Sequence, residues 1–259
     1  MTLSIEFIFS YENFYRASDI WDITCFSDYV SKCNFDVLTD GFTGVIIERN
    51  KIKEYLDRAS KQISLDIEIG LDEPNMRPSI RFFHLVDRAF ARLVVSDLDC
   101  LISLRDKWLK NIVEHENFVH ARIYKTRFDF LQNMTSIQSF EIEGIDHSQL
   151  PKKHNGLPPP LAEMAIDTSD NPGRWQFQSG YIEAVGAEMW LGKRFFELVN
   201  LPIGTLKNAE WLHVDELENV VHLTAYDKPF DSALGEQGEI QNKLRDLLFS
   251  QAKTTKSLT

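Results

Sequence analysis

Short runs in which apolar and polar residues alternate recur along the chain, and they limit its fold more than any other feature. The clearest run is at the start, where Leu3, Ile5, Phe7 and Phe9 alternate with Ser4 and Glu6. A period of two places successive side chains on opposite faces of a β-strand. This run therefore predicts a strand with one apolar face.

Two neighbouring runs predict a hairpin. Residues 80–86 and 89–95 are rich in aromatic and β-branched residues, and only Asp87 and Arg88 separate them. Such a pair with a tight connection is typical of antiparallel strands. Further strands are expected at 65–69, at 119–123, around Phe140 and Ile142, at 211–214 and at 220–226. In the second of these, we expect His120, Arg122 and Tyr124 to share a solvated face.

Apolar residues at helical spacing predict helices between the strands. The segments that show this spacing are 19–33, 52–63, 98–113 and 240–248. Asn50 is a candidate cap for the second, and Ser96 with Asp99 forms a capping box for the third. Strands interspersed with helices predict an α+β fold, with a mixed or antiparallel sheet and helices packed mainly on one face.

One segment interrupts these patterns. Residues 147–173 hold five of the nine prolines, which disfavour regular structure because they lack a backbone N–H. We expect a long surface loop there. A chain of 259 residues fits one large domain or two small ones. We predict a single domain over 1–259 with this loop as an excursion; the alternative is two lobes, 1–146 and 174–259.

Composition excludes some classes of partner. The net charge is −11, which argues against nucleic-acid binding because affinity for phosphate backbones comes mostly from Lys and Arg. The chain has no uncharged apolar run of membrane-spanning length and no basic segment at its start, so we expect no membrane contact. Three cysteines without a C-x-x-C pair fit reduced thiols, and a cytoplasmic protein is expected.

Motifs for catalysis or cofactor binding are weak. His115, Glu116 and His120 have a histidine spacing of five rather than the four of a zincin helix. Gly186 to Lys193 has five residues between its glycines rather than four, and three of them, Met189, Trp190 and Leu191, are bulky, so it does not match a phosphate-binding loop. We therefore expect no cofactor and no metal, and we expect that the protein is not an enzyme.

A histidine and carboxylate group keeps an enzymatic alternative open. His213 and His222 lie near Asp215, Glu216 and Asp227 in the sequence. Such residues could carry the acid and base steps of a hydrolase-type reaction. Their spacing matches no known motif, so a structural or surface role is favoured.

The charge of the chain is concentrated near its C-terminus. Residues 210–239 contain eight acidic residues and one lysine, a net charge of −7. We expect an acidic surface that attracts and orients a basic protein. The residues predicted to bind this partner are Glu210, Asp215, Glu216, Glu218, Asp227 and Asp231, together with Arg174 and Trp175 beside the Pro-rich segment.

Two segments in the last third resemble a known family. They are GYIEAVGAEMWLGKRFF, from Gly180 to Phe196, and VHLTAYDKPFD, from Val221 to Asp231, which precedes a helix containing Gln241 and Leu244. With the rest of residues 174–250, they resemble the immunity protein 52 family of bacterial polymorphic toxin systems. The resemblance implies an α+β cytosolic protein that binds and neutralises a cognate toxin without catalysis. It carries over no catalytic residue.

A third class of function also remains open. Aromatic residues gather between Trp175 and Phe196, and aromatic side chains are frequent in protein interfaces. A structural or regulatory homo-oligomer, such as a homodimer, would bury this segment against a second copy. Packing in the chain's own core is the commoner fate of such residues.

Overall fold

The computed structural model describes residues 3–10, 18, 37–58, 63–68, 79–85, 89–96, 109 and 112–255. Its centre is a sheet in which eight of the described strands follow the order β13-β14-β12-β7-β1-β6-β5-β4, and every pair is antiparallel. Their bounds are β1 Leu3–Ser10, β4 Ile63–Glu68, β5 Ser79–Leu85, β6 Phe90–Ser96, β7 Phe118–Lys125, β12 Glu188–Gly192, β13 His213–Glu216 and β14 Val220–Thr224. The α+β prediction is confirmed, with an antiparallel sheet.

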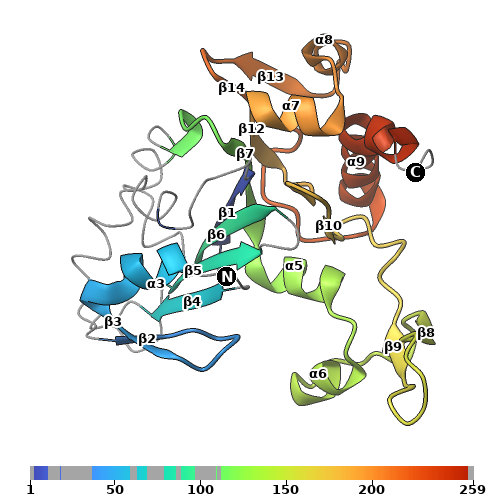
Figure 1. Ribbon diagram of the computed structural model, residues 1–259. Coiled ribbons are helices and arrows are strands. Elements are labelled where there is room, and N and C mark those ends of the chain that lie inside the picture. The colour runs from blue at the N-terminus through green and yellow to red at the C-terminus, as the bar shows by residue number, and fades with distance from the viewer. Residues whose placement is uncertain are drawn as a thin grey trace.

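Helices cover the sheet on both faces (Figure 1). The described helical segments of the main body are η1 Arg49–Lys51, α3 Ile52–Arg58, α5 Thr126–Asn133, α7 Lys193–Val199, α8 Ile203–Lys207 and α9 Gly235–Thr255. Short two-stranded sheets join β2 Val37–Thr39 to β3 Ile46–Glu48, and β10 Gln176–Phe177 to β11 Ile182–Glu183. Strands from both sides of the Pro-rich segment therefore lie in one sheet.

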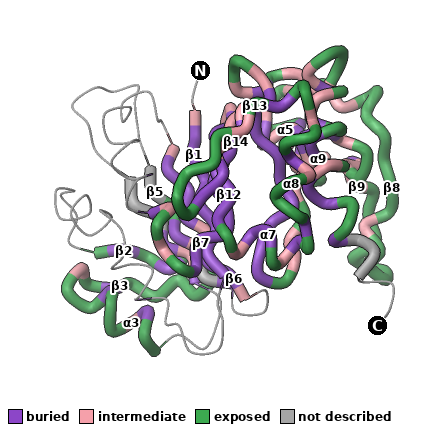
Figure 2. Tube along the Cα trace, turned by 90° about the horizontal axis from the view of Figure 1, so that it is seen from above, coloured by how far each residue is buried: buried purple, intermediate pink, exposed green. Residues whose placement is uncertain are grey.

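The two faces of the sheet form two apolar cores. On one face, Phe7 and Phe9 of β1 pack with Ile52 and Leu56 of α3. On the other, strand residues such as Leu191 and Leu223 pack with apolar residues of α7 and α9. Figure 2 shows that the chain is mostly buried along β1, β7 and β12, which lie between the two cores. The central strands are therefore buried on both faces.

Gly192 sets the junction between β12 and α7. A Cβ atom there would overlap the carbonyl oxygen of Phe118 in β7, so only glycine allows the two strands to approach this closely. Asn200 ends α7 in the left-handed conformation, with φ +55°, a common way to end a helix. The close approach of β12 to β7 therefore requires a glycine at position 192.

Several local predictions are wrong. Phe140 and Ile142 belong to a helix, α6 Ile137–Ile142, which begins after Ser136; the Ser136 hydroxyl accepts a hydrogen bond from the Ser139 N–H at 3.2 Å. Ile63 begins β4 rather than continuing the preceding helix, and Asn50 lies inside η1 rather than capping α3.

Other predictions fall on residues outside the described part of the chain. They are the helix at 19–33, most of the helix at 98–113 and the three cysteines, Cys25, Cys33 and Cys100. Leu109, Ile112 and Val113, at the end of the second helix, are helical. Among the described helices, none has the length and apolar character needed to cross a membrane.

The Pro-rich segment carries structure of its own. It contains a small hairpin of β8 Lys152–His154 and β9 Met164–Ile166, which extends away from the main sheet together with α6, the helix that precedes it (Figure 1). The Asn155 side chain fixes the loop between these strands: its amide donates to the Leu161 carbonyl at 2.8 Å, and its oxygen accepts from the Leu157 and Glu163 N–H groups. The predicted long loop is therefore an ordered arm.

Candidate interaction surface

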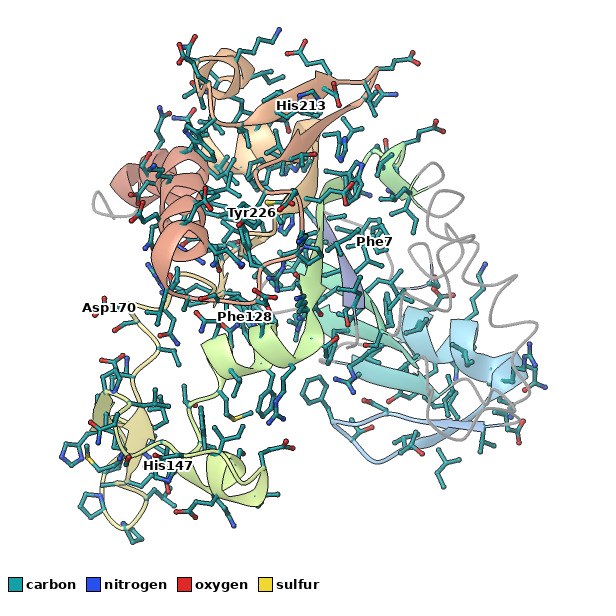
Figure 3. All side chains as sticks on the ribbon, turned by 180° about the vertical axis from the view of Figure 1, so that it is seen from behind. Phe7, Phe128, His147, Asp170, His213 and Tyr226 are labelled. Atoms are coloured by element: carbon teal, nitrogen blue, oxygen red, sulfur yellow. The ribbon has the colours of Figure 1, made fainter. Side chains whose placement is uncertain are left out.

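The β13–β14 hairpin forms one edge of the main sheet, and it carries three of the predicted acidic residues. Asp215 and Glu216 lie on β13, and Glu218 lies in the turn. All three are exposed, and about half of the Asp215 side chain (51%) is accessible to solvent. The side chain of Lys207 in α8 forms an ion pair with Glu216 at 2.8 Å. Figure 3 shows the hairpin at the end of the molecule opposite the arm, with His213 labelled.

An open groove of about 540 Å³ runs beside the hairpin turn. Exposed apolar side chains of Ile203 and Leu217 line it, together with parts of Val220 and Val221. Glu197, Glu216, Glu218 and Lys193 supply its charged lining. An apolar centre with a charged rim is typical of protein-binding surfaces.

The remaining predicted acids lie elsewhere. Glu210 and Asp227 are exposed at the other end of the hairpin, before β13 and after β14. Asp231 forms an ion pair with Lys125 at the end of β7, and its carboxylate also accepts a hydrogen bond from Gln237 at 2.9 Å. The lysine and Gln237 contacts lower the pKa of Asp231. The structure therefore brings Asp215, Glu216 and Glu218 together and places Asp231 in a separate ion pair.

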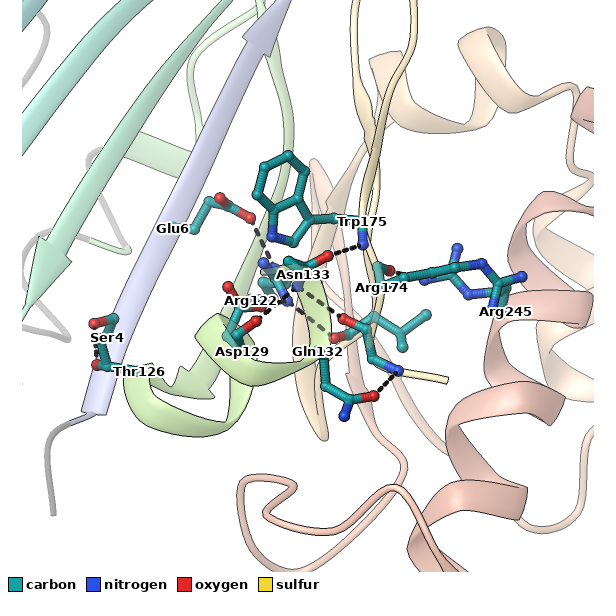
Figure 4. Close-up of polar contacts among 12 residues, drawn as sticks. Ser4, Glu6, Arg122, Thr126, Asp129, Gln132, Asn133, Arg174, Trp175 and Arg245 are labelled. Atoms are coloured by element: carbon teal, nitrogen blue, oxygen red, sulfur yellow. Dashed lines mark hydrogen bonds and ion pairs between the residues drawn. The ribbon is translucent and has the colours of Figure 1, made fainter. Parts of the chain in front are cut away.

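Arg174 and Trp175 have partners in a different part of the molecule (Figure 4). The backbone N–H of Trp175 donates to the Asn133 side-chain oxygen at 2.7 Å, and the Trp175 indole packs against Phe177 with ring centres 4.9 Å apart. The Arg174 guanidinium donates to the Asn171 carbonyl at 2.7 Å. Further contacts join Trp175 to Arg92 of β6 and Arg174 to Arg245 of α9, and none of the described contacts reaches the acidic hairpin.

Most of the aromatic residues proposed for a homo-oligomer surface are buried in the chain's own core. Tyr181, Phe195 and Phe196 pack with α9 or with one another, and Trp190 is 7% exposed. Trp211, just before β13, is 38% exposed. The apolar surface available near the hairpin thus comes from Trp211, Ile203 and Leu217.

The histidines of the enzymatic alternative form a chain of polar contacts on the hairpin. His213 Nε2 lies 3.1 Å from Asp215 Oδ2, and His222 Nδ1 lies 3.8 Å from the same oxygen. His222 Nε2 lies 3.0 Å from Glu188 Oε1, and its ring stacks on Trp190. Among the described residues, no three His, Cys, Asp or Glu side chains form a group that could hold a metal ion. Neither histidine lines the groove.

A buried charge network lies at the centre of the sheet, and sequence reasoning missed it. Glu6 of β1 binds the guanidinium groups of Arg92 and Arg122, with an Arg122 Nε to Oε2 distance of 2.8 Å. Arg122 Nη1 lies 2.9 Å from Asp129 Oδ1 of α5, as Figure 4 shows. Burial acts to raise the pKa of Glu6, but the two arginines outweigh it and lower this pKa to about 2. The network joins three strands and a helix.

The face of β7 that was expected to be solvated is buried, and that prediction is wrong. His120 and Arg122 are at most 1% exposed, and Tyr124 is 8% exposed. His120 Nε2 lies 3.1 Å from the Ile182 carbonyl oxygen, and burial lowers the pKa of His120 to about 4. His120 therefore belongs to the core, away from any zincin-like arrangement with His115. One residue of the sequence could have indicated this buried network. Glu6 lies among the apolar residues of β1, and a buried carboxylate requires a partner.

Comparison of the chain with protein-family models, with curated proteins and with solved structures found no match. The interpretation of the hairpin surface therefore rests on its geometry, its exposed apolar residues and its charge.

Proposed function

We propose that this protein is a non-catalytic immunity protein that binds and neutralises a cognate bacterial toxin in the cytoplasm. The observation that carries the proposal is the exposed acidic hairpin of Asp215, Glu216 and Glu218 beside the apolar groove. The toxin would present a basic surface to the hairpin and an apolar side chain to the groove. The proposal adopts the function that the resemblance of residues 174–250 to the immunity protein 52 family implies.

Electrostatics favour a role in recognition. Charges on a rim or edge raise the rate of association with a partner of opposite charge and disfavour partners of like charge. Lys207 of α8 pairs with this cluster, 2.8 Å from Glu216. Among the described residues, the Asp215 carboxylate has histidine neighbours, with Oδ2 3.1 Å from His213 Nε2 and 3.8 Å from His222 Nδ1. Negative charge is therefore available to a basic partner.

Packing around the hairpin favours a rigid binding element. Val221 and Leu223 of β14 are buried against the core, and β14 pairs with β12 over five residue pairs. A surface held by the main sheet loses little conformational freedom when it binds, and this preorganisation improves affinity. The acidic residues are thus presented on a fixed frame.

The hydrolase-type alternative receives less support. The His213 side chain is 70% exposed and Asp215 is 51% exposed, so water surrounds their contact. Catalytic groups gain most of their electrostatic effect where water is excluded. The stacked His222 and Trp190 instead stabilise the outer strands of the sheet.

The proposal predicts that a large polypeptide with a toxic C-terminal domain is encoded beside this chain's gene, and the test uses that polypeptide. Its C-terminal domain is produced in a bacterial host with and without this protein, and growth is measured. We expect the domain to arrest growth and the wild-type chain to relieve the arrest. The triple variant Asp215→Lys, Glu216→Lys and Glu218→Lys should lose the relief and slow association at least tenfold.

A matched control separates local charge from total charge. The variant Glu163→Lys, Asp170→Lys and Asp246→Lys changes three exposed acids on the arm and on α9 by the same amount. It should protect as well as the wild type. Full protection by the hairpin variant, or no protection by the wild type, contradicts the proposal. Thermal unfolding of each variant verifies that the fold is intact.

A further inference from the structure

β13 is an edge strand, and its backbone has one side without a neighbouring strand among the described strands. It pairs with β14 in the register His213↔Thr224, Val214↔Leu223, Asp215↔His222 and Glu216↔Val221. The Leu217 N–H donates to the Val220 carbonyl at 2.9 Å next to the turn. This bond fixes which residues of β13 direct their backbone groups inward.

Antiparallel pairs alternate between hydrogen-bonded and non-hydrogen-bonded positions. Because Leu217 and Val220 form a hydrogen-bonded pair, Asp215 and His213 also direct their N–H and C=O groups toward β14. Val214 and Glu216 direct theirs to the opposite side. The outer edge of β13 therefore presents two N–H donors and two C=O acceptors.

We propose that the partner adds an extended strand to this outer edge of β13, and that the added strand is basic. The inference deepens the proposed function and rests on it, because it names how the acidic hairpin binds its partner. Main-chain hydrogen bonds supply affinity in such strand addition, while side-chain contacts supply specificity.

The charges of the edge select the kind of strand that fits. Asp215 and Glu216 point to opposite faces of the sheet, since adjacent residues of a strand alternate. A partner strand with two consecutive basic residues would place one beside each carboxylate, and an apolar residue would lie beside Val214. Its flanking apolar side chain would reach the groove that Leu217 and Ile203 line.

The same charges disfavour a second copy of this chain on the edge. Two β13 strands side by side would bring Asp215 and Glu216 of one copy close to those of the other. Like charges on adjacent strands are destabilising, and charged edge strands are a known means of preventing self-association. The occupant is therefore a different, basic polypeptide.

The experiment uses a synthetic hexapeptide with two central lysines, a valine on each side of them, and a threonine at each end. This sequence reads the same in both directions, so it suits parallel and antiparallel pairing. Binding is measured by calorimetry, and amide hydrogen exchange is followed by NMR. We expect slowed exchange at the Val214 and Glu216 amides, with no change at the inward Asp215 amide.

Two comparisons isolate the backbone contribution. The same peptide, N-methylated at its four central residues, keeps its charge but cannot pair, and we expect at least tenfold weaker binding. Val214→Pro removes one outward N–H without removing a bond to β14, and should weaken binding by the same factor. Val214→Ala keeps the N–H and should change affinity less than threefold.

The outcomes separate the two proposals. Equal binding of the methylated peptide, unchanged exchange at Val214 and Glu216, or no binding of the hexapeptide overturns the strand-addition inference. If Val214→Pro also protects cells fully while the triple lysine variant does not, the acidic surface binds the toxin through side chains alone. If the triple lysine variant still protects, the proposed function itself fails.

Discussion

Protonation of His120 should make the fold sensitive to mild acid. The ring lies in the core, with Nε2 3.1 Å from the Ile182 carbonyl and an edge contact to Phe195. Burial is the largest cause of its low pKa; Arg122 lowers the value further, while Glu6 and the Ile182 carbonyl partly oppose the change. The result is a fall from 6.5 to about 4.

The sign follows from comparing the two states. As pH falls below 6.5, the unfolded chain protonates His120 while the folded protein does not, so the free energy of unfolding decreases. The decrease continues until pH reaches the folded value of about 4. A pKa difference of this size corresponds to a loss of about 3 kcal/mol in the free energy of unfolding.

Urea unfolding monitored by tryptophan fluorescence at pH 7 and pH 4.5 measures the effect. We expect the wild type to lose about 2 to 3 kcal/mol more than His120→Gln over this range, because glutamine does not titrate. Glutamine can still donate to the Ile182 carbonyl. The control His213→Gln changes an exposed histidine outside the core and tests whether the effect is specific to position 120. Parallel profiles for the wild type and His120→Gln would refute the reasoning.

Three further predictions concern other contacts. Glu6→Gln leaves two arginines without their shared carboxylate and should cost about 3 to 5 kcal/mol in chemical unfolding; in the wild type, the contribution of Glu6 should disappear as pH falls from 4.5 through about 2. Gly192→Ala should lower stability by about 2 kcal/mol or more through overlap with a β7 carbonyl, whereas Gly204→Ala, in α8 with open space around it, should raise it by about 0.5 to 1 kcal/mol; equal melting temperatures would contradict this contrast. Asn155→Ala should speed proteolytic cleavage in the arm several-fold and leave the global unfolding midpoint unchanged, and a large shift in that midpoint would argue against a local role.

Much of the strand pattern was predictable because alternation is a local property. β1, the β5–β6 hairpin and β7 lie where the period of two placed them. α6 was mistaken for a strand because two apolar residues separated by one position do not distinguish a strand from a six-residue helix. Whether a short segment forms a helix or a strand depends on its tertiary surroundings more than on the spacing of its apolar residues.

The burial of polar side chains was harder to predict. His120 and Arg122 lie on the polar side of an alternating strand, which indicates solvent if only one face of the sheet is covered. Here α5, α7 and α9 cover that face, and Glu6 on the neighbouring strand neutralises the arginine. The charge of residues 210–239 also indicated an acidic surface. It could not show that Asp231 lies apart from the acidic residues of the hairpin, because the pairing of Asp231 with Lys125 depends on the order of the strands in the sheet.

The position of β1 has a consequence for how the protein is assembled during synthesis. β1 lies between β6 and β7, and Ser4 faces Ser96 on one side and Tyr124 on the other. The ribosome therefore releases the first strand long before either neighbour exists, and long-range pairing of this kind slows folding. Among the described strands, β1 alone touches both halves of the sheet, β6-β5-β4 and β7-β12-β14-β13. In a nascent chain, β1 can pair with β6 once residue 96 has emerged, but its other edge stays without β7 until residue 125 has emerged, so the two halves of the sheet can unite only then.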